Sequence, residues 1–243
     1  MPRFFMAGTN IKGGMAIIRG RDAEHVRVLR LRPGEDLIIC DAQGTDYKCR
    51  LVSADPEQVE AEVLEVVPCP AEPSVAVTVL CGLPKGDRTD YIIQKCVEAG
   101  ASEIAFFLSD RCVARPGEPE KKLERWQRIA EEAAKQSGRG IIPQVSWAGD
   151  FAGALDAAIK TELPLFMYET GEREALNAVL EANKEVKTAA IVTGPEGGFA
   201  EFEAKLAKIA GLRVCSMGER ILRCETAPVV AVSALMYATG NLG

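Results

Sequence analysis

Short segments in which hydrophobic and polar positions alternate run through the first seventy residues. Over residues 59–66 the apolar positions, ending at Val66, alternate with acidic ones, which is typical of a strand with one face in solvent. Pro-Gly at 33–34 and Gln-Gly at 43–44 are turn signals between such segments. The pattern predicts a small β-barrel over residues 1–70, followed by the proline-rich linker PCPAEPS.

From residue 74 onward, nearly continuous apolar runs alternate with amphipathic stretches. A run such as VAVTVLCGL is expected of a strand that is covered on both faces in a parallel sheet. Further strands are predicted at EIAFFLS, LPLFMYE, 189–193 and RVCSMG, and helices at about 88–99, 119–137, 172–183, 200–210 and 227–239. Phe202, Leu206 and Ile209 mark one apolar face of the helix at 200–210. This alternation predicts an α/β fold with a parallel sheet over residues 74–243.

Two turns that contain glycine follow predicted strands in the C-terminal third. TGPEGGF spans 193–199 and SMGERILRCETAP spans 216–228, and each leads from a strand to a helix. On adjacent strands the two loops would lie side by side at the carboxyl edge of the sheet, where α/β proteins bind ligands. Neither segment has the spacing of a dinucleotide fingerprint or a P-loop, so a phosphate cradle is not supported. Two ordinary glycine turns remain the structural alternative.

Composition narrows the classes of protein. The single histidine, His25, excludes zinc sites built on two or three histidines. The eight cysteines include no C-x-x-C pair, so we expect small buried residues in a reducing cytosol. No stretch approaches about 18 consecutive apolar residues and the N-terminus lacks a signal-peptide core, which predicts a soluble cytoplasmic protein that does not bind a membrane.

Charge is unevenly distributed along the chain. The formal net charge is −6, but residues 1–32 carry seven basic and two acidic residues. This excess is compatible with a basic face that binds nucleic acid on an otherwise acidic protein. An ordinary solvated surface accounts for the same charges equally well.

Six motifs along the chain occur in the order of a known family. They are the opening MPRFF, H..VLR...G from His25, KGDR...IIQKCVEAG from Lys85, SDRCVAR, RWQRIAEEAAKQSGR..IP, and GPEGGF with MGERILRCETA. Together they cover nearly the whole chain and resemble the RsmE family of small-subunit ribosomal RNA uridine-N3 methyltransferases, in the SPOUT (α/β-knot) superfamily. GPEGG alone is a modest signal, whereas six ordered motifs are a strong one.

The resemblance implies both a fold and an activity. It implies a PUA-like β-barrel at residues 1–70 that helps to hold RNA, and a SPOUT methyltransferase domain at 74–243 whose C-terminal segment forms a deep trefoil knot. The implied reaction is methylation of N3 of a specific uridine in 16S ribosomal RNA, with S-adenosyl-L-methionine as cofactor. The resemblance also implies a cytoplasmic homodimer that acts in rRNA processing on the small ribosomal subunit, without a metal ion.

By the same resemblance, three loops hold the cofactor: the loop after LFMYE, the GPEGG turn and the SMGERIL segment. The residues expected to contact it are Tyr168, Glu169, Gly194, Glu196, Gly197, Gly198, Met217, Gly218, Ile221 and Leu222. Because uracil N3 is protonated at neutral pH, catalysis needs a donor that stabilises the developing uracil anion, for which Arg223 is the first choice. Glu225 or Glu196 would accept the proton or orient that arginine, and the sequence does not separate these roles.

Basic and amide side chains outside these loops are predicted to bind RNA. Those expected to hold phosphates or to shape the cleft are Lys85, Lys95, Arg111, Gln136 and Arg139, while Arg3, Arg27 and Arg30 supply the basic face of the barrel. Trp126, at helical spacing, is predicted to lie in the core.

The chain departs from the family at two positions that bear on cofactor affinity. Cys224 stands where threonine is usual, and Ala200 stands where serine is usual. Losing a serine cap costs about 1 kcal/mol of helix stability, which Glu201 would partly offset through the helix dipole. Neither change removes a charged group that we assign to catalysis.

Two alternative functions stay open. One is an enzyme of the same superfamily that acts on a different RNA position. The other is a non-catalytic RNA-binding assembly factor that uses the barrel alone. The segment RILRCETA argues against the second, because a pure binder has no need of a cofactor loop.

Overall fold

The computed structural model describes residues 1–6, 11–55, 58–114 and 119–242. The chain forms two compact units, the first made of Met1–Glu72 with Ala134–Ile142 and the second of Pro73–Ala133 with Pro143–Gly243. Residues 134–142 comprise the end of helix α3 (Pro119–Ser137) and the turn after it. The sequence analysis assigned this segment to the second part of the chain, whereas the structure groups it with the first unit.

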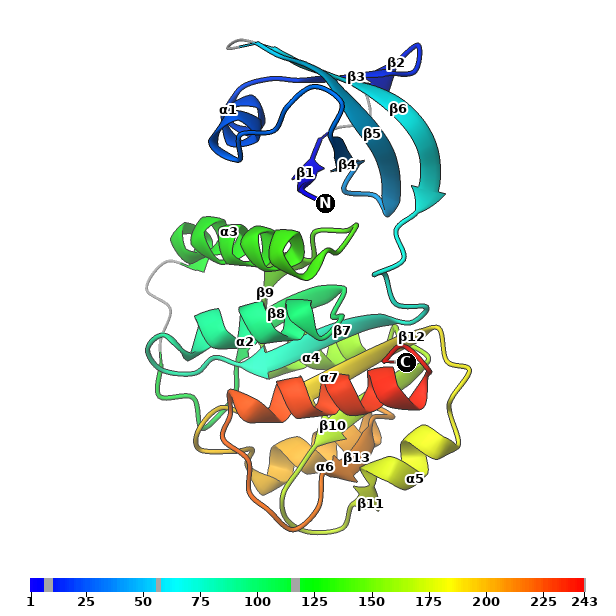
Figure 1. Ribbon diagram of the computed structural model, residues 1–243. Coiled ribbons are helices and arrows are strands. Elements are labelled where there is room, and N and C mark those ends of the chain that lie inside the picture. Colours follow the sequence, from blue (N-terminus) through cyan, green and yellow to red (C-terminus); the bar gives the residue numbers. More distant parts are fainter. Residues whose placement is uncertain (7–10, 56–57, 115–118, 243) are drawn as a thin grey trace. The chain divides into compact units, whose positions relative to one another are not determined.

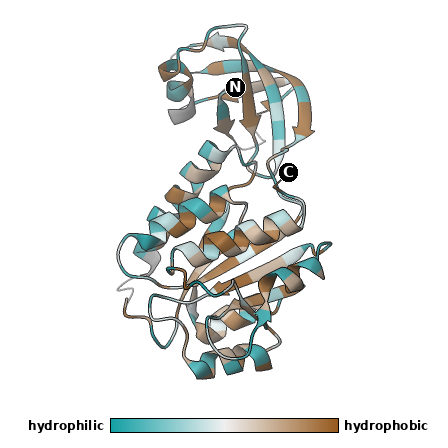
Figure 2. Ribbon diagram, turned by 60° about the horizontal axis from the view of Figure 1, so that its bottom comes forward, coloured by the Kyte–Doolittle hydropathy of each residue, from teal (hydrophilic) through white to brown (hydrophobic). Residues whose placement is uncertain are grey.

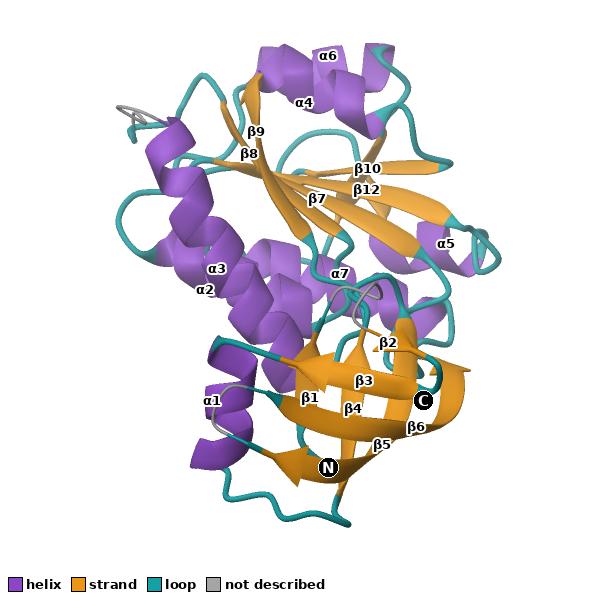
Figure 3. Cartoon of the chain, turned by 90° about the horizontal axis from the view of Figure 1, so that it is seen from above, coloured by secondary structure: helices purple, strands orange, loops and turns teal. Residues whose placement is uncertain are grey.

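The first unit is built on a six-stranded curved sheet (Figure 3). In spatial order the strands are β1 (Arg3–Phe5), β4 (Asp36–Cys40), β5 (Thr45–Ala54), β6 (Val59–Pro68), β3 (Met15–Ile18) and β2 (Ile11–Lys12). β1 and β4 are parallel, and the other neighbouring pairs are antiparallel. The helix α1 (Arg21–Val28) was not predicted, because apolar positions such as Ala23 and Val26 are too few to establish a helical period.

The alternation predicted for residues 59–66 holds only in part. Val59 and Ala61 are fully buried in the first unit. A register shift then pairs Lys48 with Glu65 and Cys49 with Val63, which leaves one extra residue in β6 between these two pairs. Such a bulge reverses the faces of the residues that follow it. The bulge brings Val66 onto the face of Val59 and Ala61, but Val66 is 55% exposed there, so its predicted burial is wrong.

The second unit contains a seven-stranded sheet in which every neighbouring pair is parallel. The spatial order is β11 (Glu174–Ala175), β13 (Arg213–Ser216), β10 (Leu163–Met167), β12 (Thr188–Thr193), β7 (Ala76–Gly82), β8 (Glu103–Leu108) and β9 (Gln144–Asp150). Figure 2 shows hydrophobic residues concentrated along the central strands. The predicted α/β class with a parallel sheet is confirmed.

Helices cover both faces of this sheet (Figures 1 and 3). α4 (Phe151–Ala158) and α6 (Glu201–Ile209) lie on one face, and α2 (Arg88–Glu98) and α7 (Thr226–Ala238) lie on the other. α5 (Leu176–Glu181) is shorter than the predicted helix at 172–183, because residues 174–175 pair with β13 as β11. β9 and α4 were not predicted, since β9 is a half-buried edge strand without a continuous apolar run.

α6 packs on the sheet through the face opposite to its large apolar residues. Phe202, Leu206 and Ile209 are 52%, 46% and 81% exposed. The buried face carries the smaller Ala204 and Ala207, with Glu203. The periodicity identified an apolar stripe correctly, but that stripe does not face the core.

Aromatic side chains form much of the core of the second unit. The rings of Phe166 and Phe199 lie 4.3 Å apart between centroids, so the GPEGGF turn is anchored at its last residue. Trp126 is 1% exposed and packs against Phe106, which confirms its predicted core position. All eight cysteines are buried, as the sequence predicts.

Candidate active site

Three loops at the carboxyl edge of the parallel sheet enclose one pocket of about 530 Å³, which we call the three-loop pocket. It lies in the second unit and is lined by Arg88, Met167, Tyr168, Glu169, Gly194, Pro195, Glu196, Gly198, Ser216, Met217, Gly218, Arg220, Ile221, Leu222, Arg223, Cys224, Glu225 and Ala227. The lining includes every residue predicted to contact the cofactor except Gly197, and also the three predicted catalytic residues.

The loops meet in a different way from the one expected. β12 and β13 were predicted to be neighbours, but β10 lies between them and pairs with both. The loop after β10 therefore lies between the GPEGG turn and the SMGERIL segment. This strand order brings the loop after β10 to the pocket together with the other two loops that the family resemblance implies.

Glycines keep the GPEGG turn close to its neighbours. Gly198 has φ +63°, and a Cβ atom there would lie 2.4 Å from Glu169 Oε1 on the loop after β10. A Cβ atom on Gly82, at the end of β7, would lie 2.8 Å from the backbone nitrogen of Pro195. A Cβ atom on Gly82 would meet the backbone of Pro195 and displace the turn, whereas at Gly198 it would meet only the flexible end of the Glu169 side chain, and the positive φ is what favours glycine there. Gly197 faces Arg111 instead, with 3.0 Å between its virtual Cβ and the arginine Cβ.

A buried carboxylate fixes the start of α6. Glu203 is 1% exposed, and its Oε2 accepts the backbone N–H of Ala200 at 2.8 Å. Its Oε1 accepts the backbone N–H of Asp110, in the loop after β8, at 3.0 Å. Glu203 thus satisfies the Ala200 N–H, which is the half of a capping box that the third helical residue supplies, whereas a serine side chain at position 200 would supply the other half. Glu201, which the sequence analysis expected to compensate, pairs with Lys205 on the surface.

Arg88 connects the two acidic residues of the site. Its Nη1 lies 2.6 Å from Glu196 Oε1 and its Nε lies 3.5 Å from Glu225 Oε2. The same Glu196 oxygen also accepts the backbone N–H of Lys85 at 2.8 Å. Glu196 therefore links the GPEGG turn to the segment at the start of α2. The sequence analysis gave Arg88 no role, although its place at the first position of α2 after KGD was a usable signal.

Glu225 is held as an anion beside the pocket. Burial by itself would raise the pKa of Glu225, but its own backbone N–H, the Cys224 thiol, Arg88 and Arg223 together lower it below the ordinary value. The Cys224 thiol donates to Glu225 Oε2 at 3.2 Å, and burial raises the pKa of this thiol to about 12, so it stays protonated. A threonine hydroxyl at position 224 would supply the same donor.

Arg223 is exposed at the mouth of the pocket. Among the residues that the structure describes, its guanidinium has no ion-pair partner closer than the 4.0 Å limit of a salt bridge. Its charge nevertheless acts on Glu225. The group is thus available to a ligand in the pocket.

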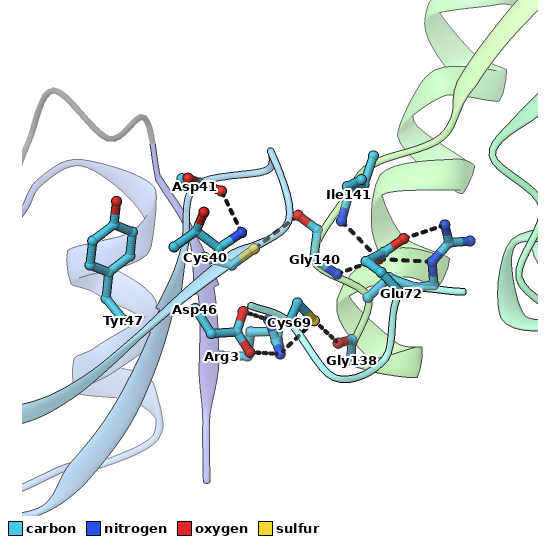
Figure 4. Close-up of polar contacts among 12 residues, drawn as sticks. Arg3, Cys40, Asp41, Asp46, Tyr47, Cys69, Glu72, Gly138, Gly140 and Ile141 are labelled. Carbon is cyan, nitrogen blue, oxygen red and sulfur yellow. Dashed lines mark hydrogen bonds and ion pairs between the residues drawn. The ribbon is translucent and has the colours of Figure 1, made fainter. Parts of the chain in front are cut away.

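The residues predicted to bind RNA differ in their exposure to solvent. The exposed ones are Arg27, Arg30, Lys85, Arg111 and Gln136, and Lys95 is half-buried in an ion pair with Glu98. Arg3 and Arg139 are corrected, because their guanidiniums are bound inside the first unit: Arg3 to Asp46 (Figure 4) and Arg139 to Glu72. Arg139 is only 3% exposed, so it presents no surface to a phosphate.

Within residues 1–6, 11–55, 58–114 and 119–242, no cluster of three or more His, Cys, Asp or Glu side chains is arranged to hold a metal ion. In the same part of the chain, no helix is both long and apolar enough to cross a membrane.

Comparison with known proteins places the chain in a family. An RNA methyltransferase domain matches residues 71–236, and an RNA methyltransferase PUA domain matches residues 18–64. Ribosomal RNA small subunit methyltransferase E of Bacillus subtilis (strain 168) is 36% identical over 230 residues, 91% of this chain and 90% of that protein. The Synechocystis protein of the same name is 35% identical over 86% of this chain and 68% of its own length.

Solved structures agree with the sequence comparison. The crystal structure of ribosomal RNA small subunit methyltransferase E from Neisseria gonorrhoeae, bound to S-adenosyl methionine, has a TM-score of 0.82 and 32% identity. The match covers 98% of this chain and 97% of that one. With its N-terminal PUA domain, its parallel sheet and its three-loop pocket, the chain belongs to the ribosomal RNA small subunit methyltransferase E family.

Proposed function

We propose that the protein is an S-adenosylmethionine-dependent methyltransferase that methylates N3 of a specific uridine in 16S ribosomal RNA. The observation that carries this proposal is the three-loop pocket, whose wall brings Arg223 and Glu225 together. The relative from Neisseria gonorrhoeae binds S-adenosyl methionine, which supports the same cofactor here. The substrate is proposed to be rRNA of the small ribosomal subunit in the cytoplasm.

The pocket fits the proposed cofactor. Its volume of about 530 Å³ is in the range of small-molecule sites, roughly 300–1,000 Å³. Gly198 leaves open the space that a Cβ atom would fill next to Glu169. Backbone groups of 194–198, 217–218 and 221–222, with Tyr168 and Glu169, are proposed to hold the cofactor. The cofactor supplies an electrophilic methyl group on a sulfonium.

The protein's own task is to make uracil N3 nucleophilic and to place it in line. Glu225 is ionised and lines the pocket, so we propose that it accepts the proton of uracil N3 as the general base. Arg223 donates to the uracil oxygens onto which the negative charge spreads. Glu196 is already bound by Arg88 and by the Lys85 N–H, so it positions the loops and is not the base. Positioning contributes several kcal/mol more, by analogy with oriented intramolecular reactions of about 7–11 kcal/mol.

A deep trefoil knot is part of the proposal. The strand order supports it, because the chain crosses from β12 past β10 to β13. It then returns through residues 217–225 to pack α7 against β12 and β7. The return segment and the loop after β10 line the same pocket. Knots are rare, so this one is proposed from the combination of path and family and not from general folding rules.

The first unit is proposed to hold RNA as a PUA-like domain at residues 1–70, with the methyltransferase domain at 74–243. Arg27 and Arg30, both exposed at α1 and just after it, are the basic side chains that support this role. Arginines of this kind bind phosphates and position the protein without reading sequence.

We also propose a homodimer that uses α7. This helix buries Val232 and Leu235 in its own unit, while Val230 and Tyr237 remain 39% and 77% exposed. These two exposed residues, with Leu176 of α5, line an open pocket of about 1120 Å³. The chain should therefore show twice its own mass in solution at micromolar concentration, and Tyr237→Glu should yield single chains. A single-chain mass for the unaltered protein would contradict the dimer.

Product analysis tests the proposed reaction directly. Small-subunit particles are incubated with the protein and S-adenosylmethionine, and the modified nucleoside is identified by mass spectrometry. We expect 3-methyluridine in 16S rRNA. A methyl group on another position would favour the alternative enzyme of the superfamily. If calorimetry detects no binding of S-adenosylmethionine, the result would favour the non-catalytic assembly factor.

A further inference from the structure

A second open pocket adjoins the three-loop pocket at the start of α2. It measures about 560 Å³, and Lys85, Asp87, Arg88, Tyr91 and Glu225 are among the residues that line it. Arg88 and Glu225 line both pockets. A ligand in one pocket therefore faces a ligand in the other across these two side chains.

We propose that this second pocket, which we call the Tyr91 pocket, binds the single unpaired pyrimidine nucleotide that accepts the methyl group. The inference rests on the proposed function, since it places the acceptor base next to the methyl donor. An acceptor nitrogen must approach the methyl group directly, so its site must open into the three-loop pocket. The shared wall of Arg88 and Glu225 provides such a connection.

Tyr91 supplies a surface on which a base can stack. Its side chain is 47% exposed and lies three residues after Arg88 in α2, so both residues lie on the same face of the helix. Proteins commonly hold bases that have left a helix or a loop by stacking them on aromatic rings. Because the Tyr91 ring is exposed beside an open pocket, it can stack on a base without a change in the packing of α2.

The polar side chains around the Tyr91 pocket complement the hydrogen-bonding groups of uracil and the phosphate of its nucleotide. The Watson–Crick edge of uracil has one N–H donor between two carbonyl acceptors. Glu225 is an acceptor for that N–H, and the Arg88 guanidinium is a donor for a carbonyl oxygen. Lys85 is exposed, and within the described residues its ammonium has no ion-pair partner, so it is available to a phosphate. Asp87, the acid at the N-cap of α2, would repel the phosphate toward Lys85.

Two further described pockets adjoin the three-loop pocket, and both suit the acceptor less well. One shares residues 216–218 with it, and the other shares Tyr168 and Glu169. Neither is lined by Arg88 or Glu225. An acceptor in either pocket would lie away from the carboxylate that is proposed to take its proton.

Substitutions of Tyr91 test the inference by kinetics. Tyr91→Ala should lower kcat/KM for rRNA roughly tenfold or more, because one stacking contact is lost. Its affinity for S-adenosylmethionine should stay unchanged, since Tyr91 does not line the three-loop pocket, and this also shows that the variant is folded. Tyr91→Phe keeps the ring and should restore most of the lost kcat/KM. Phe202→Ala, which removes another exposed ring (52%) on α6, is the matched control.

Photocrosslinking tests the same contact directly. An rRNA transcript containing 5-iodouridine is crosslinked to the full chain in the presence of the cofactor, and the modified peptide is mapped by mass spectrometry. We expect a crosslink at Tyr91. Crosslinks that fall outside residues 85–91 would contradict the Tyr91 pocket, and so would a Tyr91→Ala variant with wild-type kcat/KM. If the unaltered protein still forms 3-methyluridine in that case, the proposed function stands and only the inference fails. A protein that forms no 3-methyluridine would remove the proposed function and the inference with it.

Discussion

Replacing Glu72 by alanine should lower the free energy of unfolding of the first unit by about 3–5 kcal/mol. Glu72 accepts from Arg139 Nη2 at 2.8 Å and from the backbone N–H groups of Gly140 and Ile141 at 2.6 and 3.0 Å (Figure 4). Arg139 is only 3% exposed, so removing Glu72 takes a counter-ion away from a buried charge. Truncating one member of such a pair costs far more than the pair contributes.

Hydrogen exchange in β4 and β5 measures this loss, because both tryptophans, Trp126 and Trp147, lie in the second unit and do not report on the first. Glu65→Ala is the matched control, since its ion pair with Lys48 is half exposed and is expected to contribute less than about 1 kcal/mol. An equal, small effect of both substitutions would show that the Glu72 pair does not stabilise the unit.

The Glu72 contact also predicts how stability depends on pH. Burial would raise the pKa of Glu72, but the Arg139 guanidinium and the two N–H groups outweigh it and lower the pKa. A carboxyl whose folded-state pKa is lowered stabilises the fold fully above its unfolded pKa, about 4.3 for glutamate. That stabilisation is lost as the pH falls through the folded-state value. The difference between wild type and Glu72→Ala should therefore shrink in acid.

Replacing Arg223 by lysine should slow methyl transfer roughly 10²-fold or more, which is the usual effect of losing one oriented anion-stabilising donor. Lysine keeps the positive charge but lacks the planar fork that can donate to two acceptors at once. The guanidinium is exposed at the pocket mouth and its charge acts on Glu225. Because the interaction strengthens only in the transition state, cofactor affinity should change little.

Single-turnover methylation of 16S rRNA in small-subunit particles measures the chemical step alone. Arg30→Ala is the contrasting variant, because it should weaken RNA binding and flatten its salt dependence, while saturating RNA restores most of the turnover. Methylation by Arg223→Lys at the wild-type rate would show that Arg223 is not the anion-stabilising donor.

Much of the second unit follows from local sequence. Apolar runs predicted five of the seven strands of the parallel sheet, whereas the edge strands β9 and β11 were not predicted. The positions of α2, α3, α6 and α7 agree with the predicted helices to within one residue at each end. The residues of the three loops were also identified from the sequence, because motifs record which side chains are present.

Other features depend on which segments meet, and no local pattern contains that information. β10 lies between β12 and β13, so the loop after β10 lies between the other two loops of the site. Arg88 and Glu196 pair across 108 positions of sequence, and Arg139 and Glu72 across 67. The partner of a charged side chain decides whether that charge is available to RNA, and the sequence does not show the partner. Arg139 was therefore predicted to bind RNA, although it is buried.

The helix α6 shows the same limit. The spacing of Phe202, Leu206 and Ile209 determines that they share one face, because 3.6 residues make a turn. It does not determine which face meets the sheet. Small alanines and a hydrogen-bonded Glu203 pack there instead. The sequence by itself determined most of the elements and the chemical groups of this protein, whereas tertiary packing decided their partners, since burial and pairing arise only when distant segments come together.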